Sequence, residues 1–259
     1  MSERIIIRDV TKAMGMIEKV NYVQRNHLIR YNYAVAQTKP GDQVLDIACG
    51  SGYGSKLLAF EGCNVTGVDV AQEALDLCKE YNDHDNIRWL RGDIRNVKKF
   101  FDEKQFDVIV CFETLEHISD GQEEIVAGFS KILKDDGILV ASIPLNHPDE
   151  VWHKRKFTFD QRDKLFGDVF PHVAYPEANA SLVVCRKAEW TGDQWVSLAA
   201  AAKLDELKQE SHDFAHGHCQ FCGTEQEKLN VHFSRHDCIE IYTRVALCDE
   251  CWKILGTWL

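Results

Sequence analysis

The stretch VLDIACGSGYGS, residues 44–55, places a short apolar run, an aspartate and three closely spaced glycines in a row. Glycine tolerates a left-handed backbone and leaves room for a ligand to approach the main chain. A strand followed by such a loop and then a helix is an arrangement that nucleotide-binding sheets use. We therefore expect the loop to hold a ligand at the carboxyl end of a strand.

The loop departs from the dinucleotide-binding fingerprint, in which the glycines follow the pattern G-x-G-x-x-G. Counted from Gly50, the third glycine arrives one position early, at Gly54, with Gly52 between them. Asp46 stands just before the loop, where its negative charge disfavours a pyrophosphate and favours a positively charged group. The expected ligand therefore carries a cation next to Asp46.

Two further aspartates follow the next two apolar runs of the chain. Asp69 ends the run in GVDV, where a carboxylate can accept hydrogen bonds from both hydroxyls of a ribose. Asp93 follows in GDI, where it can accept a hydrogen bond from the amino group of an adenine. Ligands of doubly wound sheets bind at the carboxyl ends of the strands. A cation, a ribose and an adenine in this order describe S-adenosylmethionine.

Short apolar runs alternate with helical patterns, which predicts an α/β fold with a doubly wound, mostly parallel sheet of seven strands. The expected strands are residues 43–48, 64–68, 87–90, 106–112, 137–143, 168–175 and 180–186. The expected helices are residues 17–37, 53–60, 71–81 and 121–134. The last two strands should form an antiparallel hairpin that closes the sheet.

Five motifs, LDIACGSGYG, GVDV, GDI, FDVIVCFETLEHI and GILVASIP, together resemble the class I S-adenosylmethionine-dependent methyltransferases over about residues 25–187. The resemblance implies a Rossmann-like methyltransferase fold and a methyl-transferring enzyme. It assigns the cofactor to Asp46, Ala48, Gly50, Gly52, Gly54, Asp69, Val70, Asp93, Ile94 and Phe112. His27, Arg30 and Tyr31, in the preceding helix, either cover the cofactor or serve as packing and surface residues.

The fourth apolar run ends in CFETLEHI and does not carry the Asn/Asp-Pro-Pro-Tyr motif of enzymes that methylate amino groups of bases. It offers Glu113, Glu116 and His117, and His153 follows the fifth run in WHKRKFTF. Two carboxylates and two imidazoles can form a site for Mg²⁺ or Mn²⁺. These four residues are the catalytic candidates: as metal ligands, with His117 as a general base without metal, or as structural groups.

The E-x-x-E-H pattern with a later histidine resembles the metal-dependent small-RNA 2′-O-methyltransferases and the ubiquinone-biosynthesis O-methyltransferases. In such enzymes a metal would lower the pKa of a hydroxyl in a vicinal diol or catechol and orient it. The segment Ser142–Phe166 also resembles bacterial glycan methyltransferases, which would place His147, Trp152, His153, Lys154 and Arg155 on the acceptor side. We therefore expect O-methylation of a sugar, glycan or other small diol.

Two alternatives remain open, an RNA ribose 2′-O-methyltransferase acting at a terminal diol and a non-catalytic scaffold that binds the cofactor. The net charge of −11 disfavours nucleic acid as a partner, and the intact Asp46, Asp69 and Asp93 disfavour the scaffold. No apolar run reaches the roughly 18 residues of a membrane span, and the first residues lack a signal-peptide layout. We expect a cytoplasmic protein.

The ten cysteines fall into two groups. Five are scattered through apolar runs, where a free thiol behaves as a small hydrophobic group, and five crowd into the last 41 residues. Two C-x-x-C pairs, 25 residues apart, predict a structural zinc site with the ligands Cys219, Cys222, Cys248 and Cys251. Two disulfides or unpaired core thiols are the alternatives.

These patterns divide the chain into three parts. We expect a methyltransferase domain at residues 1–190, a helical connector at 191–215 and a small zinc-binding module at 216–259. From Lys203 to Leu259 there are six Lys and Arg residues against ten Asp and Glu residues, so the module is acidic. It therefore suits a protein partner or self-association better than nucleic acid.

Overall fold

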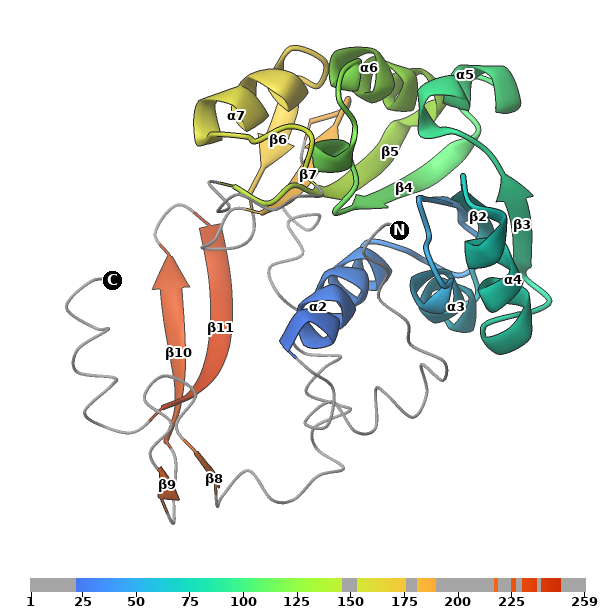
Figure 1. Ribbon diagram of the computed structural model, residues 1–259. Helices are drawn as coiled ribbons and strands as arrows, with labels where there is room; N and C mark the ends of the chain where they lie inside the picture. Colours follow the sequence, from blue (N-terminus) through green and yellow to red (C-terminus); the bar gives the residue numbers. More distant parts are fainter. Residues whose placement is uncertain are drawn as a thin grey trace. The chain divides into compact units, whose positions relative to one another are not determined.

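The structure, a computed structural model, describes residues 22–145, 153–175 and 181–189 and the backbone of four strands nearer the carboxyl terminus (Figure 1). The chain divides into two compact units, Met1–Trp190 and Thr191–Leu259. In the second unit β8 (Gly217–His218) pairs with β9 (Glu225–Gln226), and β10 (Asn230–His236) pairs with β11 (Ile239–Leu247), both antiparallel. The four predicted zinc ligands and the predicted connector lie outside the described residues.

A seven-stranded sheet in the order β3-β2-β1-β4-β5-β7-β6 forms the centre of the first unit. Its strands are β1 (Gln43–Ile47), β2 (Asn64–Asp69), β3 (Ile87–Arg91), β4 (Phe106–Phe112), β5 (Leu133–Ser142), β6 (His172–Ala174) and β7 (Leu182–Arg186). β1 is parallel to β2 and β4, whereas β7 is antiparallel to β5 and β6. The prediction of a mostly parallel sheet closed by an antiparallel hairpin is confirmed.

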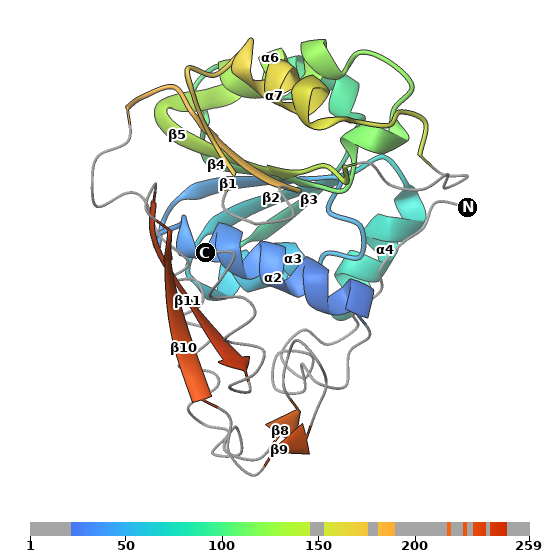
Figure 2. The same ribbon diagram turned by 90° about the vertical axis from the view of Figure 1, so that its left-hand side faces the viewer.

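Helices cover both faces of this sheet. Figure 2 shows α2 (Tyr22–Ala36), α3 (Tyr53–Phe60) and α4 (Gln72–Tyr81) on one face, and α6 (Gln122–Ile132) and α7 (Phe159–Gly167) on the other. The single turn α5 (Val97–Phe100) follows β3. Two covered faces explain why most residues of the central strands are apolar and buried. None of the helices in the described part of the chain has the length and apolar character to cross a membrane.

The junction between α6 and β5 differs from the predicted one. The helix ends at Ile132 and the strand begins at Leu133, although we expected the helix to reach residue 134 and the strand to begin at 137. Leu133 is fully buried and pairs with Phe106, and an irregularity in the pairing then accommodates the polar residues that follow it. Because polar residues follow Leu133, the apolar pattern of the sequence did not indicate that the strand begins there.

Helix α7 was not predicted. Its first turn carries a capping box, in which the Gln161 N–H donates to the Thr158 hydroxyl and the Thr158 N–H donates to the Gln161 side chain. Such reciprocal bonds satisfy the free N–H groups at a helix start. The T-x-x-Q pattern was therefore the sequence signal for this helix.

The five scattered cysteines lie in the core as free thiols, as their apolar surroundings predicted. They are Cys49, Cys63, Cys78, Cys111 and Cys185. Cys111 and Cys185 belong to the main cluster of buried side chains, which includes Leu45, Ile109 and Leu139 from three neighbouring strands.

Candidate functional site

The predicted cofactor residues lie at the carboxyl ends of neighbouring strands. Asp46 belongs to β1, Asp69 ends β2, and Phe112 ends β4, while Asp93 follows β3. β1 pairs with β2 on one side and β4 on the other, so that Asp46 stands where the strand order reverses. Ligands of doubly wound sheets bind in the crevice at such a reversal.

Asp46 is a buried carboxylate with two hydroxyl partners. Its side chain accepts hydrogen bonds from the Tyr31 hydroxyl at 3.0 Å and the Ser55 hydroxyl at 2.6 Å. Burial raises the pKa of the Asp46 carboxyl from 3.8 to about 6, against the opposing effect of these two hydrogen bonds. The carboxylate is therefore charged at neutral pH, and its charge is desolvated, which strengthens its attraction for a cation.

The glycine loop uses its glycines in different ways. Gly50 has a φ of 58°, and no heavy atom lies within 4 Å of the position that a Cβ atom would take. At Gly54 a Cβ atom would lie 2.0 Å from ring atoms of Tyr31. Gly54 thus admits the tyrosine, whereas Gly50 leaves space beside the main chain for a ligand. Ala48 and Gly52 also have positive φ, and Gly52 precedes the first residue of α3.

Asp69 joins the loop to the end of β2. One of its carboxylate oxygens accepts the Gly50 N–H at 3.0 Å, and the other accepts the Ala71 N–H at 2.9 Å. Each carboxylate oxygen can accept a second hydrogen bond, so Asp69 retains capacity for ribose hydroxyls. Val70, directly after Asp69, exposes 61 % of its surface and offers apolar area beside the same position.

Asp93 forms an ion pair at the position expected for adenine. It precedes the 3₁₀ turn η2 (Ile94–Asn96), accepts the Arg95 N–H, and contacts the Arg95 guanidinium with both oxygens. Hydrogen bonding to Arg95 holds the pKa of the Asp93 carboxyl below its usual range. An adenine amino group would therefore share Asp93 with Arg95. Ile94, the first residue of this turn, has a buried side chain.

Helix α2 contacts the site through side chains at positions i, i+3 and i+4, which share one helix face. His27 Nδ1 lies 3.0 Å from the Tyr53 hydroxyl, and Arg30 pairs with Glu113 at 3.5 Å. The Tyr31 ring packs edge-on against Tyr53 and Phe112. Burial, and then Arg30, lower the pKa of the His27 imidazole to about 4, so His27 is neutral at physiological pH. The structure thus places all three residues at the site.

Glu113 is held apart from the other acceptor-side candidates. Its φ of 47° lies in the left-handed region, and its carboxylate accepts the Ser142 hydroxyl at 2.7 Å beside Arg30. The Glu113 N–H also donates to the Ser142 hydroxyl oxygen. The left-handed backbone directs the Glu113 side chain toward Arg30 of α2 and Ser142 at the end of β5. No sequence pattern singled out Ser142 as a partner of Glu113.

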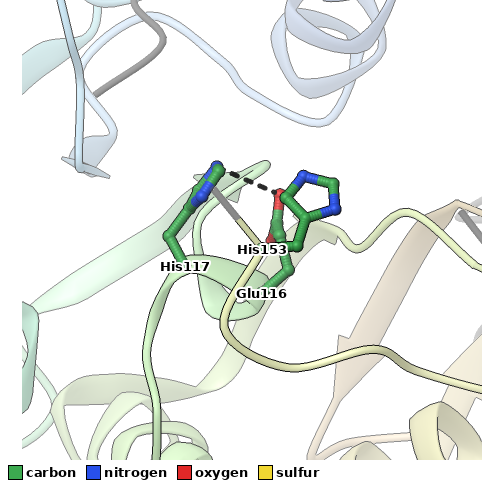
Figure 3. A group of neighbouring side chains, drawn as sticks. All are labelled: Glu116, His117 and His153. Atoms are coloured by element: carbon green, nitrogen blue, oxygen red, sulfur yellow. Dashed lines mark ion pairs between the residues drawn. The ribbon is translucent and has the colours of Figure 1, made fainter. Parts of the chain in front are cut away.

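Glu116, His117 and His153 form a group in which one potential ligand atom from each lies within 4.8 Å of the others (Figure 3). Glu116 and His117 belong to the 3₁₀ turn η3 (Leu115–His117), and His153 follows β5. Figure 3 shows the two imidazoles flanking the Glu116 carboxylate, which lies 3.7 Å from His117 Nε2. Glu116 is 1 % exposed. The structure brings together three of the four predicted ligands, and Glu113 is not among them.

Two of the predicted acceptor-side residues, His147 and Trp152, lie outside the described residues. The Arg155 guanidinium donates hydrogen bonds to Gln122 and Glu123 of α6, and its predicted place on the acceptor side stays a prediction. Sequence reasoning passed over Gln122, since a single glutamine at the start of a helix carries no distinguishing pattern.

Residues 44–137 match the family model described as a methyltransferase domain. This match, the strand order and the row of strand-end aspartates define the core as a class I, Rossmann-like S-adenosylmethionine-dependent methyltransferase domain. S-adenosylmethionine is the cofactor of this class, as predicted.

Curated relatives are named ubiquinone biosynthesis O-methyltransferases. The protein of Rickettsia bellii is 28 % identical over 130 residues, which cover 49 % of this chain and 52 % of the relative. The protein of Coxiella burnetii is 36 % identical over 117 residues, which cover 44 % and 49 %. The chain thus spans about half the length of the curated relatives it matches.

A solved structure shares the fold. It is a chain from the complex between the Haloferax volcanii Trm112 methyltransferase activator and a methyltransferase, with a TM-score of 0.55 and 19 % identity. The match covers 71 % of this chain and 100 % of that chain. At this identity the likeness supports the fold alone.

Proposed function

We propose that this chain transfers the methyl group of S-adenosylmethionine to a hydroxyl group of a small molecule. The observation that carries the proposal is the group of Glu116, His117 and His153, which follows β4 and β5 on the same edge of the sheet as the cofactor residues. S-adenosylmethionine supplies an electrophilic methyl group. The protein must then orient the hydroxyl and remove its proton.

The cofactor side provides charge and space for binding. The buried charge of Asp46 suits the cationic methionine part of the cofactor, and the open position at Gly50 lets it approach the main chain. Asp69 has acceptor capacity for the ribose, and Asp93 for the adenine amino group. Each group of the cofactor therefore meets a complementary group at the end of a different strand.

The acceptor side fits a divalent cation. Three donor atoms converge, and two imidazoles with one carboxylate suit Mn²⁺ better than Mg²⁺, which prefers oxygen ligands. Glu116, His117 and His153 would hold the ion. When bound, it would lower the pKa of an acceptor hydroxyl and fix its orientation.

The same residues support a second mechanism without a cation. His117 is about one third exposed, and Glu116 lies 3.7 Å from its Nε2 atom. The carboxylate would orient the imidazole, so that His117 would accept the hydroxyl proton directly. Both mechanisms act on a hydroxyl.

The names of the curated relatives favour O-methylation of a small molecule. The two histidines beside Glu116 suit an acceptor with two adjacent hydroxyls, such as a catechol or a sugar diol. An RNA end is the less favoured acceptor because the net charge is −11 and the Arg155 guanidinium is bound to α6.

The test is methyl transfer from isotope-labelled S-adenosylmethionine to catechols, sugar nucleotides and RNA with a free 3′-terminal diol. We expect labelled ether products from the small diols, and mass spectrometry should place the methyl group on oxygen. Transfer to amino groups alone, or to none of the acceptors while the cofactor binds, would contradict the proposal.

We also propose that the unit Thr191–Leu259 binds structural zinc through Cys219, Cys222, Cys248 and Cys251. The support is the spacing of the two C-x-x-C pairs, in which each pair can supply two ligands of a tetrahedral site. With all four positions filled by protein, this zinc would have no role in methyl transfer. The acidic module would instead serve a protein partner or self-association.

A further inference from the structure

We propose that Arg155 is a positioning residue that fixes His153 relative to Glu116 and His117. The inference rests on the proposed function and deepens it, because it assigns the geometry of the acceptor site to a residue outside the three-residue group. His153 lies 36 positions after His117 in the chain, on a different segment. Contacts between the two segments must therefore set the distance between their rings.

The main chain makes the first connection between the two segments. The N–H groups of Lys154 and Arg155 both donate to the carbonyl oxygen of Glu116, at 2.8 and 3.0 Å. The residues directly after His153 are thereby bound to the residue that supplies the carboxylate. The ring centroids of the His117 and His153 imidazoles lie 5.1 Å apart.

The Arg155 side chain makes the second connection. Its Nη1 donates to Gln122 Oε1 at 2.7 Å, and its Nη2 donates to Glu123 Oε1 at 3.1 Å. The guanidinium carbon lies 4.8 Å from the ring centroid of Phe157, which is buried. A planar guanidinium satisfies two acceptors and a ring face together, which a lysine cannot do.

Gln122, which accepts the hydrogen bond from Arg155, is itself hydrogen-bonded to the backbone of η3. Its side chain is fully buried, and its Nε2 donates to the carbonyl oxygens of Leu115 and Ile118 at 3.1 and 2.6 Å. These two carbonyls stand at the first residue of the turn and just after its last. Arg155 and Gln122 therefore hold the turn that bears Glu116 and His117 against the segment that bears His153.

The arrangement closes a ring of contacts around the site. The Glu116 carbonyl oxygen accepts the Arg155 N–H, the Arg155 guanidinium donates to the Gln122 side chain, and Gln122 donates to the Leu115 carbonyl oxygen in η3. Loss of the guanidinium removes one side of the ring and leaves the other. We therefore expect a looser His153 in a folded protein.

The experiment compares Arg155→Ala and Arg155→Lys with the wild-type chain and with Lys164→Ala as a matched control. Lys164→Ala removes the exposed ion pair between Lys164 of α7 and Asp168, the residue directly after the helix. Three quantities are measured: Mn²⁺ affinity by electron paramagnetic resonance, the ¹⁵N resonances of the His153 imidazole in ion-free protein, and kcat with the cofactor Kd. The His153→Gln variant assigns the resonances.

We expect Arg155→Ala to weaken Mn²⁺ binding about tenfold or more, as is typical for residues that orient metal ligands. Its kcat should fall, its cofactor Kd should stay at the wild-type value, and its His153 resonances should move toward those of a solvent-exposed histidine. Arg155→Lys should lie between, because an ammonium can serve only one of the two acceptors well. Lys164→Ala should match the wild type.

Wild-type His153 resonances in Arg155→Ala would overturn the positioning role, and so would an unchanged Mn²⁺ affinity in a wild type that binds Mn²⁺. Failure of the proposed function has a different signature, namely a wild type that binds the cofactor but transfers no methyl group and binds no Mn²⁺. In that case the imidazole resonances still decide whether Arg155 positions His153.

Discussion

The hydroxyl of Tyr31 donates a 3.0 Å hydrogen bond to Oδ1 of Asp46, which joins helix α2 to the end of the central strand β1. The same tyrosine ring occupies the space that a side chain at Gly54 would need. One residue of α2 thus contacts both the acidic group and the glycine loop of the cofactor site. The charge on Asp46 and the packing at Gly54 lead to separate predictions.

Cofactor affinity should depend on the protonation of Asp46. Burial raises the pKa of this carboxyl to about 6, so its negative charge is lost as the pH falls through that value. A neutral Asp46 no longer attracts the cationic methionine group. We expect the Kd for S-adenosylmethionine, measured by calorimetry from pH 5 to 8, to rise below about pH 6. Asp46→Asn should bind weakly at every pH, and a pH-independent wild-type Kd would contradict the prediction.

The charge on Asp46 should lower the free energy of unfolding, although the same charge favours cofactor binding. A carboxyl whose folded pKa is raised contributes stability that is present below its unfolded pKa of 3.8 and is lost as the pH rises through about 6. At pH 7.5 the buried charge costs on the order of 3 kcal/mol by this linkage. Asp46→Asn should therefore unfold at a higher urea concentration than wild type at pH 7.5, and the difference should vanish near pH 4. A less stable variant at pH 7.5 would show that burial does not govern this group.

Gly50→Ala and Gly54→Ala should have different effects on cofactor binding and on the free energy of unfolding, because only Gly50 has open space beside it. At Gly54 the new methyl group collides with the buried Tyr31 ring, so we expect a loss of roughly 1–3 kcal/mol in the free energy of unfolding. At Gly50 the methyl group meets no protein atom, and the left-handed backbone alone costs about 1–2 kcal/mol. Only Gly50→Ala should place the methyl group in the ligand's space, so it should weaken cofactor binding more than its stability loss explains. Equal binding losses would contradict this division.

Glu116→Gln and Glu113→Gln offer a matched pair for the metal proposal. Glu116 stands in the three-residue group, whereas Glu113 contacts Ser142 and Arg30. If an ion takes part, chelator should abolish turnover and spare cofactor binding, and Mn²⁺ should restore turnover. Glu116→Gln should raise the Mn²⁺ concentration required, because ligand charge sets the affinity, and Glu113→Gln should not. Full activity in chelator would favour His117 as the base.

Metal analysis of the full chain checks the carboxyl-terminal proposal. Freshly purified, reduced protein should carry about one zinc per chain, since four thiolates complete one tetrahedral site. Cys222→Ser should lower the zinc content and leave cofactor binding intact, because the Asp46 site belongs to the other compact unit. Zinc-free wild-type protein would contradict the proposal.

The strands were predictable because both faces of the sheet are covered, so apolar runs mark them directly. The start of β5 was not, since Leu133 is followed by polar residues that the pairing irregularity accommodates. The strand-end aspartates were predictable because parallel strands bring their carboxyl ends together. The spacing E-x-x-E-H suggested that Glu113 joins Glu116, but spacing does not reveal the left-handed backbone at Glu113 that turns its side chain away. The zinc ligands remain a prediction.

The reversal of strand order at β1 divides the two tasks of the site between the two halves of the sheet. The cofactor aspartates belong to the β1-β2-β3 half, and the three-residue group belongs to the segments after β4 and β5. Substitutions in those two segments can therefore change the compound that is methylated without disturbing the source of the methyl group. For protein engineering, a new acceptor specificity calls for exchange of two loops on a retained cofactor-binding scaffold, with Gln122 and Arg155 carried over to keep the two loops in register.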